Sequence, residues 1–394
     1  MDINQLKQKF IEIFGDNGEA LRVFSSPGRV NLIGEHTDYN GGYVFPAALT
    51  LSSTVVARPR KDRQINLIAT DLGIMVSASL DELEKHKDIK WGNYQLGVAD
   101  ELQKAGYKLV GCDMLFHDTV PLGSGLSSSA AIEVVTAITL VTLGNEAHGV
   151  NSGIDMVEMA KISQTAEHNY VGVNCGIMDQ FASAMGKANH AIFLDCKDLS
   201  FEHVPLDLKG YRIVISNTKK KRSLGAVKYN ERRSECEAGL EILKKAIPGI
   251  SCLGEVSAEQ FEKNKHLITD EVVRKRVEHV IYEDDRVLKS VEALKKGDLH
   301  SFGRYMIESH NSLRDLYEVT GLELDTLVEE ALKIDGVIGS RMTGAGFGGC
   351  TVSIVREDAV DRFIENVGSA YAQKTGITAE FYVSEVGDGG REIK

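Results

Sequence analysis

The sequence predicts an α+β fold built as two lobes, and three observations support this prediction. The chain has 394 residues, enough for two or three domains of about 150 residues each. Its first half is rich in β-branched and turn residues, whereas apolar residues of the second half recur mostly at helical spacing. Separate blocks of strands and helices are typical of α+β proteins. We place the boundary near residue 205, which gives an N-terminal lobe of residues 1–205 and a C-terminal lobe of residues 206–394.

The first half begins with an amphipathic pattern that predicts a short helix over residues 4–14. Residues 22–56 are β-branched and turn-rich, with Val30 and Leu32 alternating before a loop at 34–42. The segment 123–129 reads as a loop leading into a helix that ends near Leu143. The remaining elements are expected as strands over 54–58, 65–69 and 112–117 and helices over 93–105 and 154–168, followed by a loop that carries Asp179.

The second half opens with a strand that starts at the apolar run 211–215. Helical spacing then predicts helices over 229–243, 271–295, 299–318 and 323–333. Strands at 350–355 and 379–384 are expected to close the chain. The basic stretch 219–225 is expected to be an exposed, solvated loop.

The composition narrows the class of protein. Apolar residues make up 43% and charged residues 26% of the chain, and the formal charge is −12. This acidity works against nucleic-acid and anionic-membrane partners. We expect a soluble, cytoplasmic protein, because no signal peptide is visible and the apolar stretch 130–143, about 14 residues, is shorter than the roughly 20 that span a bilayer. The six scattered cysteines indicate reduced thiols and no zinc site.

A first polar segment, Pro27–Gly42, could be only a polar turn formed around its Asn-Gly pair. It also places Glu35, His36, Asp38 and Asn40 within six residues. Carboxylates and an imidazole on one loop supply the donors and acceptors that a sugar-binding site needs. Metal binding by His36 is the weaker interpretation, because no second histidine has suitable spacing.

A second segment, Pro121–Ala131, contains glycines and serines and runs directly into an apolar helix. Serines at a helix start act as N-caps, and the free N–H groups there attract phosphate. The segment lacks the Gly-Lys-Ser/Thr of a Walker loop and the third glycine of a Rossmann fingerprint, and protein-kinase signatures are absent. Phosphate binding by another route is the interpretation that we favour over a flexible linker.

A third segment, Ser340–Thr351, has four glycines within six residues and precedes a strand. It could be a tight packing corner, but the entropic cost of glycine favours a functional reason for close backbone approach.

Asp179, which lies between apolar neighbours, has two interpretations as well. It could be a satisfied core carboxylate, or a base tuned by its surroundings.

Taken together in this order, the three segments resemble the GHMP small-molecule kinase superfamily. The run Gly28–Tyr39 narrows the resemblance to the galactokinase family, and the resemblance spans nearly the whole chain. It implies a two-lobed fold with the active site in the cleft between the lobes and the Gly-rich loop 343–349 in the second lobe. It also implies ATP-dependent phosphorylation of the anomeric hydroxyl of α-D-galactose. The rivals are a related sugar 1-kinase, for N-acetylgalactosamine or arabinose, and a non-catalytic galactose sensor.

The resemblance also implies a role for individual residues. Asp179 matches the catalytic carboxylate of the family and Arg29 the guanidinium next to it. Mg²⁺ would be held by Ser129 and Glu167. The ATP phosphates would be cradled by Gly123, Ser124, Gly125, Leu126, Ser127, Ser128 and Ser129. The sugar would be bound by Glu35, His36, Thr37, Asp38, Gly176, Asp179 and Tyr229. The sequence leaves the oligomeric state open, and a monomer is compatible with it.

Overall fold

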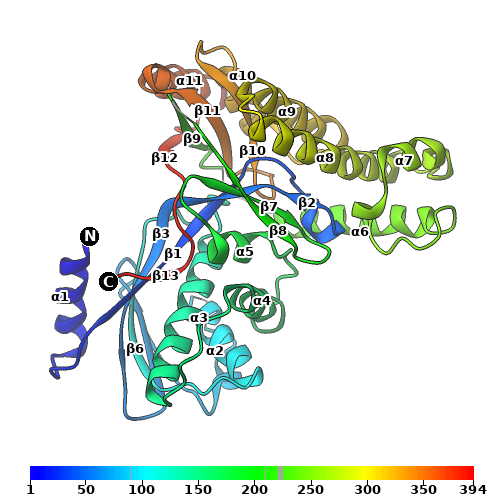
Figure 1. Ribbon diagram of the computed structural model, residues 1–394. Coiled ribbons are helices and arrows are strands. Elements are labelled where there is room, and N and C mark those ends of the chain that lie inside the picture. The colour runs from blue at the N-terminus through cyan, green and yellow to red at the C-terminus, as the bar shows by residue number, and fades with distance from the viewer. Residues whose placement is uncertain (90, 209, 221–224) are drawn as a thin grey trace.

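The computed structural model describes residues 1–89, 91–208, 210–220 and 225–394. Its ribbon forms two lobes, one above the other (Figure 1). A six-stranded sheet forms the lower lobe and a four-stranded sheet the upper lobe, with a smaller three-stranded sheet between them. The predicted α+β class and its two lobes are confirmed. The boundary near residue 205 stays a prediction.

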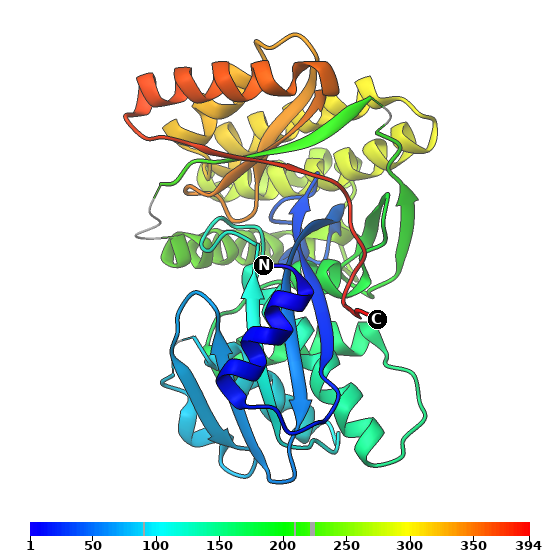
Figure 2. The same ribbon diagram turned by 90° about the vertical axis from the view of Figure 1, so that its left-hand side faces the viewer.

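The lower lobe is built on a sheet in the order β13-β1-β3-β6-β4-β5, in which only β4 and β6 pair in parallel. The strands are β1 (Arg22–Asn31), β3 (Pro46–Pro59), β4 (Gln64–Ala69), β5 (Met75–Ser79), β6 (Cys112–Asp118) and β13 (Arg391–Glu392). Because β13 pairs with β1, placing Glu392 opposite Phe24, the end of the chain returns from the upper to the lower lobe (Figure 2). We did not predict this last strand from the sequence.

Alternate residues of these strands face two different layers. Leu115 of β6 packs with Phe10 of α1 (Ile3–Phe14), whereas Met114 and Phe116 pack toward helices on the opposite face. The helices of that opposite layer are α2 (Asn93–Lys104), α3 (Ser128–Ala147), α4 (Met156–Ala166) and α5 (Met178–Met185). The period of two along each strand is thus the reason for the layered lobe.

Helix α3 is the central helix of the lower lobe. It has 20 residues, more than the 14 expected, and is apolar enough by composition to cross a membrane. However, 72% of its apolar window is buried inside the protein. A helix that is apolar on all sides is typical of a buried core position. This helix brings the serine-rich segment to the middle of the molecule.

The upper lobe is a sheet in the order β10-β11-β9-β12 with helices on both faces. Ile213 and Ile215 of β9 pack toward α8 and α9, whereas Val214 between them packs toward α10 and α11. The strands are β9 (Tyr211–Asn217), β10 (Val337–Thr343), β11 (Cys350–Arg356) and β12 (Glu380–Ser384). The helices are α8 (Glu271–Lys295), α9 (Leu299–Ser312), α10 (Leu322–Ala331) and α11 (Val360–Thr375).

The two lobes share one hydrophobic cluster. Val30 and Phe45 from the first lobe and Phe302 from the second belong to this cluster and are fully buried. Around it the remaining elements are arranged: the small sheet of β2 (Tyr43–Val44), β7 (His190–Asp195) and β8 (Phe201–Pro205), and α6 (Gly225–Leu243) and α7 (Ala258–Asn264), which project to one side (Figure 1). Short 3₁₀ or π turns lie at Asp38–Asn40, Leu83–His86, Glu167–Val171, Leu253–Glu255, Lys265–Leu267, Leu313–Tyr317 and Glu357–Ala359.

The structure corrects several sequence-based expectations. Asp179 lies in the first turn of α5 and not in a loop. This helix has only eight residues, which is shorter than the window of about 11–18 residues over which helical spacing can be recognised. Ser340–Thr343 belong to strand β10 rather than to a loop. Helix α11 and strands β2, β7 and β8 were not predicted. Part of the basic stretch 219–225, residues 221–224, lies outside the described residues.

Candidate active site

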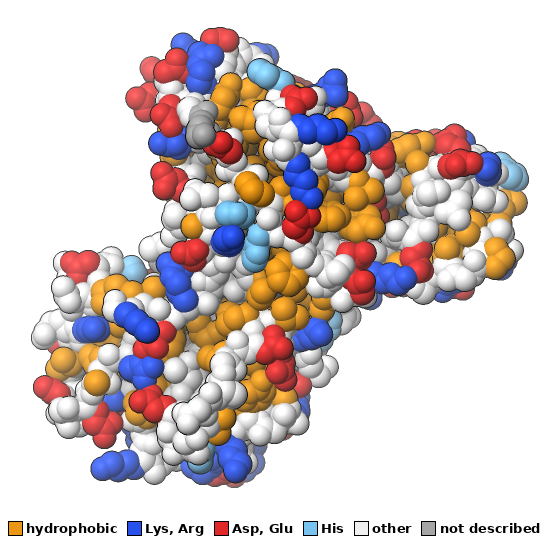
Figure 3. Space-filling view, in the orientation of Figure 1, with side chains coloured by type: hydrophobic (Ala, Val, Ile, Leu, Met, Phe, Trp, Pro, Cys, Tyr) orange, Lys and Arg blue, Asp and Glu red, His pale blue; other side chains and the backbone are white. Residues whose placement is uncertain are grey.

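The candidate active site is a cavity of about 800 Å³ that is lined from both lobes. Its walls come from residues 34–43 after β1, called here the sugar-type segment, and from the serine-rich segment before α3, residues 172–179, α6 and the Gly-rich loop. On the face seen in Figure 3, hydrophobic side chains gather where the lobes meet, and charged side chains are scattered over the rest of the surface. The three segments that the sequence singled out thus meet at one place.

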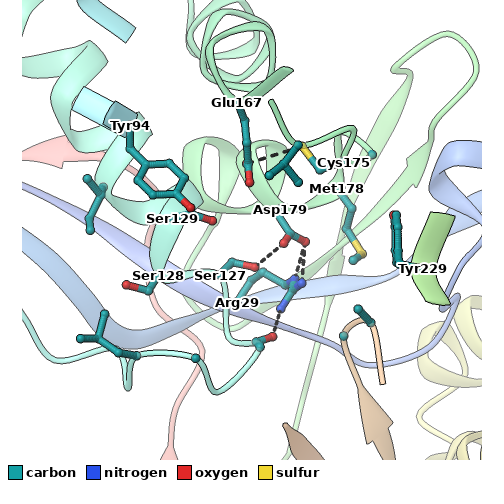
Figure 4. A pocket seen from close by; sticks show the side chains of 18 of the residues that line it. Arg29, Tyr94, Ser127, Ser128, Ser129, Glu167, Cys175, Met178, Asp179 and Tyr229 are labelled. Carbon is teal, nitrogen blue, oxygen red and sulfur yellow. Dashed lines mark hydrogen bonds and ion pairs between the residues drawn. The ribbon is translucent and has the colours of Figure 1, made fainter. Parts of the chain in front are cut away.

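Asp179 lies at the centre of this cavity and is held by two partners (Figure 4). Its Oδ1 accepts from Arg29, whose Nε is 2.8 Å and Nη2 2.6 Å away, and its Oδ2 accepts from the Ser127 hydroxyl at 2.6 Å. Arg29 is almost fully buried and also donates to the carbonyl of Gly125 at 2.7 Å. The predicted pairing of Asp179 with Arg29 is present, and both oxygens of the carboxylate are held in place.

The serine-rich segment wraps around the start of α3. Ser127 adopts a left-handed conformation, with φ of 62°, and does not cap the helix with its side chain as we expected. Its hydroxyl is used for Asp179 instead. Ser128 and Ser129 follow at the helix N-terminus and line the cavity. The free N–H groups and the dipole at such a terminus favour bound phosphate.

Two of the predicted phosphate-loop residues face away from the cavity. The Ser124 hydroxyl donates to the carbonyl of Pro121 at 2.6 Å, and the side chain of Leu126 is fully buried in the core. Gly123 and Gly125 line the cavity, and both have a positive φ that favours glycine. Ser124 and Leu126 therefore shape the turn, whereas its glycines leave the backbone open to a ligand.

Glu167 begins the π turn after α4 and shares a buried polar cluster with Glu133 of α3. The amide of Gln180 donates to both carboxyl groups, to Glu167 at 2.7 Å and to Glu133 at 3.0 Å. Burial and the nearby charge of Asp179 raise the pKa of Glu167 to about 7. Burial, together with the charge of Glu167, raises the pKa of Glu133 well above its usual value. This concentration of carboxyl groups around Ser129 is a place where a cation would be stabilised.

Glu35 lines the cavity but is already paired within the protein. Its Oε2 lies 2.7 Å from Nη1 of Arg341, and its Oε1 accepts from the N–H of Gly344 at 2.8 Å. Both members of this ion pair are buried. Thr37 does not line the cavity, because its hydroxyl bonds the carbonyls of Gly34 and Tyr43. The structure thus gives Thr37 a loop-holding contact rather than a side chain that faces a ligand.

His36 faces the cavity as a neutral ring. Its Nε2 lies 3.2 Å from the carbonyl of Ala345 and must donate there, so Nδ1 accepts from the Tyr39 hydroxyl at 2.7 Å. Burial lowers the pKa of His36 to about 3. The Tyr39 hydroxyl in turn lies 2.9 Å from that of Tyr317. The imidazole therefore links the sugar-type segment to the Gly-rich loop.

Asp38, Gly176 and Tyr229 come together on the same side of the cavity. Burial and the charge of Asp179 raise the pKa of Asp38 to about 7. A Cβ placed on Gly176 would lie only 1.8 Å from Oδ2 of Asp38, so any other residue there would displace the Asp38 carboxyl group. The ring of Tyr229 packs 5.6 Å from that of His36. These side chains form a polar pocket next to Asp179.

Sequence reasoning missed the other end of the cavity. Apolar side chains from separate elements line it: Leu72, Trp91, Tyr94, Phe116 and Ile132. None lies in a glycine-rich or polar motif, so no local signal marks them. Glu133 was visible as the one carboxyl group in the apolar run after Ser129, and this isolation was a usable signal.

Comparisons with known proteins agree with this geometry. Three family profiles match the chain: "Galactokinase galactose-binding signature" over residues 8–59, "GHMP kinases N terminal domain" over 93–187 and "GHMP kinases C terminal" over 290–373. A crystal structure of a mevalonate kinase shares the fold, with a TM-score of 0.64 at 19% identity over 92% of this chain and 98% of that chain. The fold and the cavity therefore define a GHMP kinase.

More similar relatives narrow the family. The chain is 52% identical to a galactokinase of Clostridium acetobutylicum and 45% identical to one of Bacillus subtilis, each over 99% of both chains. The crystal structure of Lactococcus lactis galactokinase complexed with galactose matches with a TM-score of 0.94 at 44% identity, over 99% of this chain and 100% of that one. The chain belongs to the galactokinase family. The predicted family, fold and kinase activity are confirmed.

Proposed function

We propose that this member of the galactokinase family transfers the γ-phosphoryl group of ATP to the anomeric hydroxyl of α-D-galactose, giving galactose 1-phosphate and ADP. One observation carries the proposal. Asp179 lies where the polar pocket meets the serine-rich segment, with one oxygen held by Arg29 and the other by Ser127. A carboxylate between a sugar pocket and a phosphate loop is in the position that this reaction requires.

The two substrates would occupy opposite ends of the cavity. Galactose would bind beside Asp38 and Tyr229, with Glu35, His36 and Gly176 shaping the pocket around it. The ATP phosphates would lie against Ser128, Ser129 and the start of α3. The adenine ring of ATP would lie among the apolar side chains near Trp91 and Tyr94.

In the reaction, Asp179 orients the 1-hydroxyl of the sugar and accepts its proton as the hydroxyl attacks the γ-phosphorus. The bond from that phosphorus to the β–γ bridging oxygen breaks, and ADP leaves. Phosphoryl transfer has a loose transition state, so positioning and charge stabilisation supply most of the catalysis. Arg29 would place its buried positive charge beside the reacting atoms, and the N–H groups at the start of α3 would stabilise charge on the phosphate oxygens.

Ser129 and Glu167 are the residues that would hold Mg²⁺, an ion that usually takes one or two protein carboxylates plus phosphate and water. The donor set fits this ion. Both residues line the cavity, and burial beside Asp179 raises the pKa of Glu167, a condition that a bound cation relieves. Among the described residues no group of three or more His, Cys, Asp and Glu side chains could hold a metal, which fits an ion shared with ATP. When bound, Mg²⁺ would neutralise phosphate charge.

We further propose that the protein acts in the cytoplasm, on the sequence expectations given above.

The test is ADP release with Mg-ATP against galactose, N-acetylgalactosamine, arabinose, glucose and mevalonate. We expect rapid turnover with galactose. Turnover with another sugar in place of galactose would mean that we assigned the wrong phosphoryl acceptor, while the proposed mechanism would still hold. Binding of galactose without turnover would identify a sensor and refute the proposal.

A further inference from the structure

The sugar-type segment is held from the other lobe by side chains of a single helix, α8. Three of its residues bond the backbone of this segment. His279 Nε2 lies 3.1 Å from the carbonyl of Glu35, and Asp284 accepts from the N–H of Tyr43 at 2.7 Å. Glu283 accepts from the N–H groups of Gly34 and Glu35, at 3.0 and 3.3 Å. Both ends of the segment are therefore tied to residues 279–284 of α8.

Glu283 is the centre of this arrangement. Its Oε1 also accepts from the Ser309 hydroxyl at 2.5 Å, and its Oε2 lies 2.8 Å from Nε and Nη2 of Arg286. The carboxyl group is fully buried. Burial by itself would raise the pKa of Glu283, but the charges of Arg286 and Arg341 and the Ser309 hydroxyl help to lower it to about 2. A buried carboxylate with this many donors is fixed in place.

Arg341 connects this network to Glu35, which lines the cavity. The Nε of Arg341 donates to the Ser309 hydroxyl at 3.2 Å, and its Nη1 lies 2.7 Å from Oε2 of Glu35. Glu283 therefore holds the backbone of Glu35, while Arg341 holds its side chain. Ser309 joins the two. This ring of contacts fixes a residue that faces the cavity.

The backbone between these anchors adopts conformations that need support. Gly34 has a φ of 95° and His36 a φ of 64°, the second in the left-handed region that is uncommon for residues other than glycine. Asp38 follows two residues later and faces the cavity. A shift at Gly34 would therefore move the groups that contact the sugar.

We propose that Glu283 is a positioning residue for the sugar substrate: from the second lobe it holds the backbone at Gly34 and Glu35, and thereby sets where the sugar-binding side chains stand. It does not reach the cavity itself, because it is absent from the cavity lining. The inference rests on the proposed function for the identity of the sugar. The hydrogen bonds from Glu283 to the segment do not depend on it.

The test is Glu283→Gln, which keeps the shape and loses the charge that pairs with Arg286. We expect the KM for galactose to rise 10- to 100-fold while the KM for ATP changes less than threefold. Amide hydrogen exchange of the peptide 34–43, measured without sugar, should become at least tenfold faster than in the parent. Glu330→Gln is the matched control. Like Glu283, Glu330 is a shielded helix carboxylate with charged partners, Lys333 and Lys374. Unlike Glu283, it makes no hydrogen bond or ion pair with the sugar-type segment among the described residues, and it does not line the cavity, so neither KM nor hydrogen exchange at 34–43 should change.

A merely structural role for Glu283 would raise both KM values together or speed exchange across the whole chain, and either result overturns the proposal. Unchanged exchange at 34–43 overturns it as well. If Glu283→Gln does not fold, Ser309→Ala decides by the same two readouts, since it removes one donor to Glu283 and leaves its charge paired. Failure of the parent to phosphorylate galactose would refute the proposed function instead, whereas the exchange experiment would still test the anchor.

Discussion

Replacing Gly176 by alanine tests the sugar pocket most directly. The φ of Gly176 lies outside the left-handed region, so the backbone accepts alanine, but the new Cβ would lie 1.8 Å from Oδ2 and 2.3 Å from Cγ of Asp38. Ordinary contacts begin near 3.4 Å, so the carboxyl group has to move by about 1.6 Å. Such a shift removes a hydrogen bond to a charged group, a loss of about 1.5–3 kcal/mol.

The expected result of Gly176→Ala is a KM for galactose about 10- to 150-fold higher, since about 1.4 kcal/mol corresponds to a factor of ten. The KM for ATP should stay close to that of the parent. Steady-state kinetics with each substrate varied in turn measures both. Gly153→Ala is the control, because Gly153 is exposed, has an ordinary φ and would meet nothing within 4 Å. A galactose KM within twofold of the parent would refute the placement of Asp38 and Gly176 in the pocket.

Three further predictions concern the reacting groups. Asp179→Asn should lower turnover by about 10²- to 10⁴-fold, the usual share of a general base, and near-normal single-turnover rates would remove Asp179 from that role. Glu167→Ala should raise the Mg²⁺ concentration needed for half-maximal rate while leaving galactose binding by calorimetry unchanged; an unaltered Mg²⁺ titration would place the ion elsewhere. Burial raises the pKa of Asp38 to about 7, above its value in the unfolded chain, so the stability that its protonated form contributes is lost as pH rises through 7. In urea unfolding, the free energy of unfolding of Asp38→Asn should therefore equal that of the parent at pH 4 and exceed it by about 1–2 kcal/mol at pH 8. The difference is kept to this size because solvent in the cavity screens part of the effect. A difference in unfolding free energy that does not depend on pH would contradict this prediction.

Much of the fold could be read from local patterns. The apolar runs in β3 and β6, which are buried over most of their length, and the helical spacing in α8 and α9 are patterns of neighbouring residues. The exceptions have physical reasons. Helix α5 has only eight residues, too few for helical spacing to be recognised in a window of about 11–18 residues. In α11 the buried Phe363, Val367 and Tyr371 do recur at helical spacing, a signal that was present but not used.

The sequence by itself determined which polar and glycine-rich segments are candidates for the site and the order in which they occur. The serine-rich segment and the sugar-type segment were identified from the intrinsic binding properties of helix-start serines, carboxylates and imidazoles, whereas the roles of Asp179 and Arg29 followed from the resemblance to the galactokinase family. The positive φ at Gly123 and Gly125 is likewise a property that glycine carries into any structure.

Only the tertiary structure decided how these groups are paired and tuned. It gave the Ser127 hydroxyl to Asp179 rather than to a helix cap, placed Glu35 beside Arg341, and brought Glu283 to the backbone of Gly34, 249 positions away in the chain. Hydrogen bonds act within about 3 Å, and the cost of burying a charge depends on every atom around it. Neither quantity exists until distant segments meet.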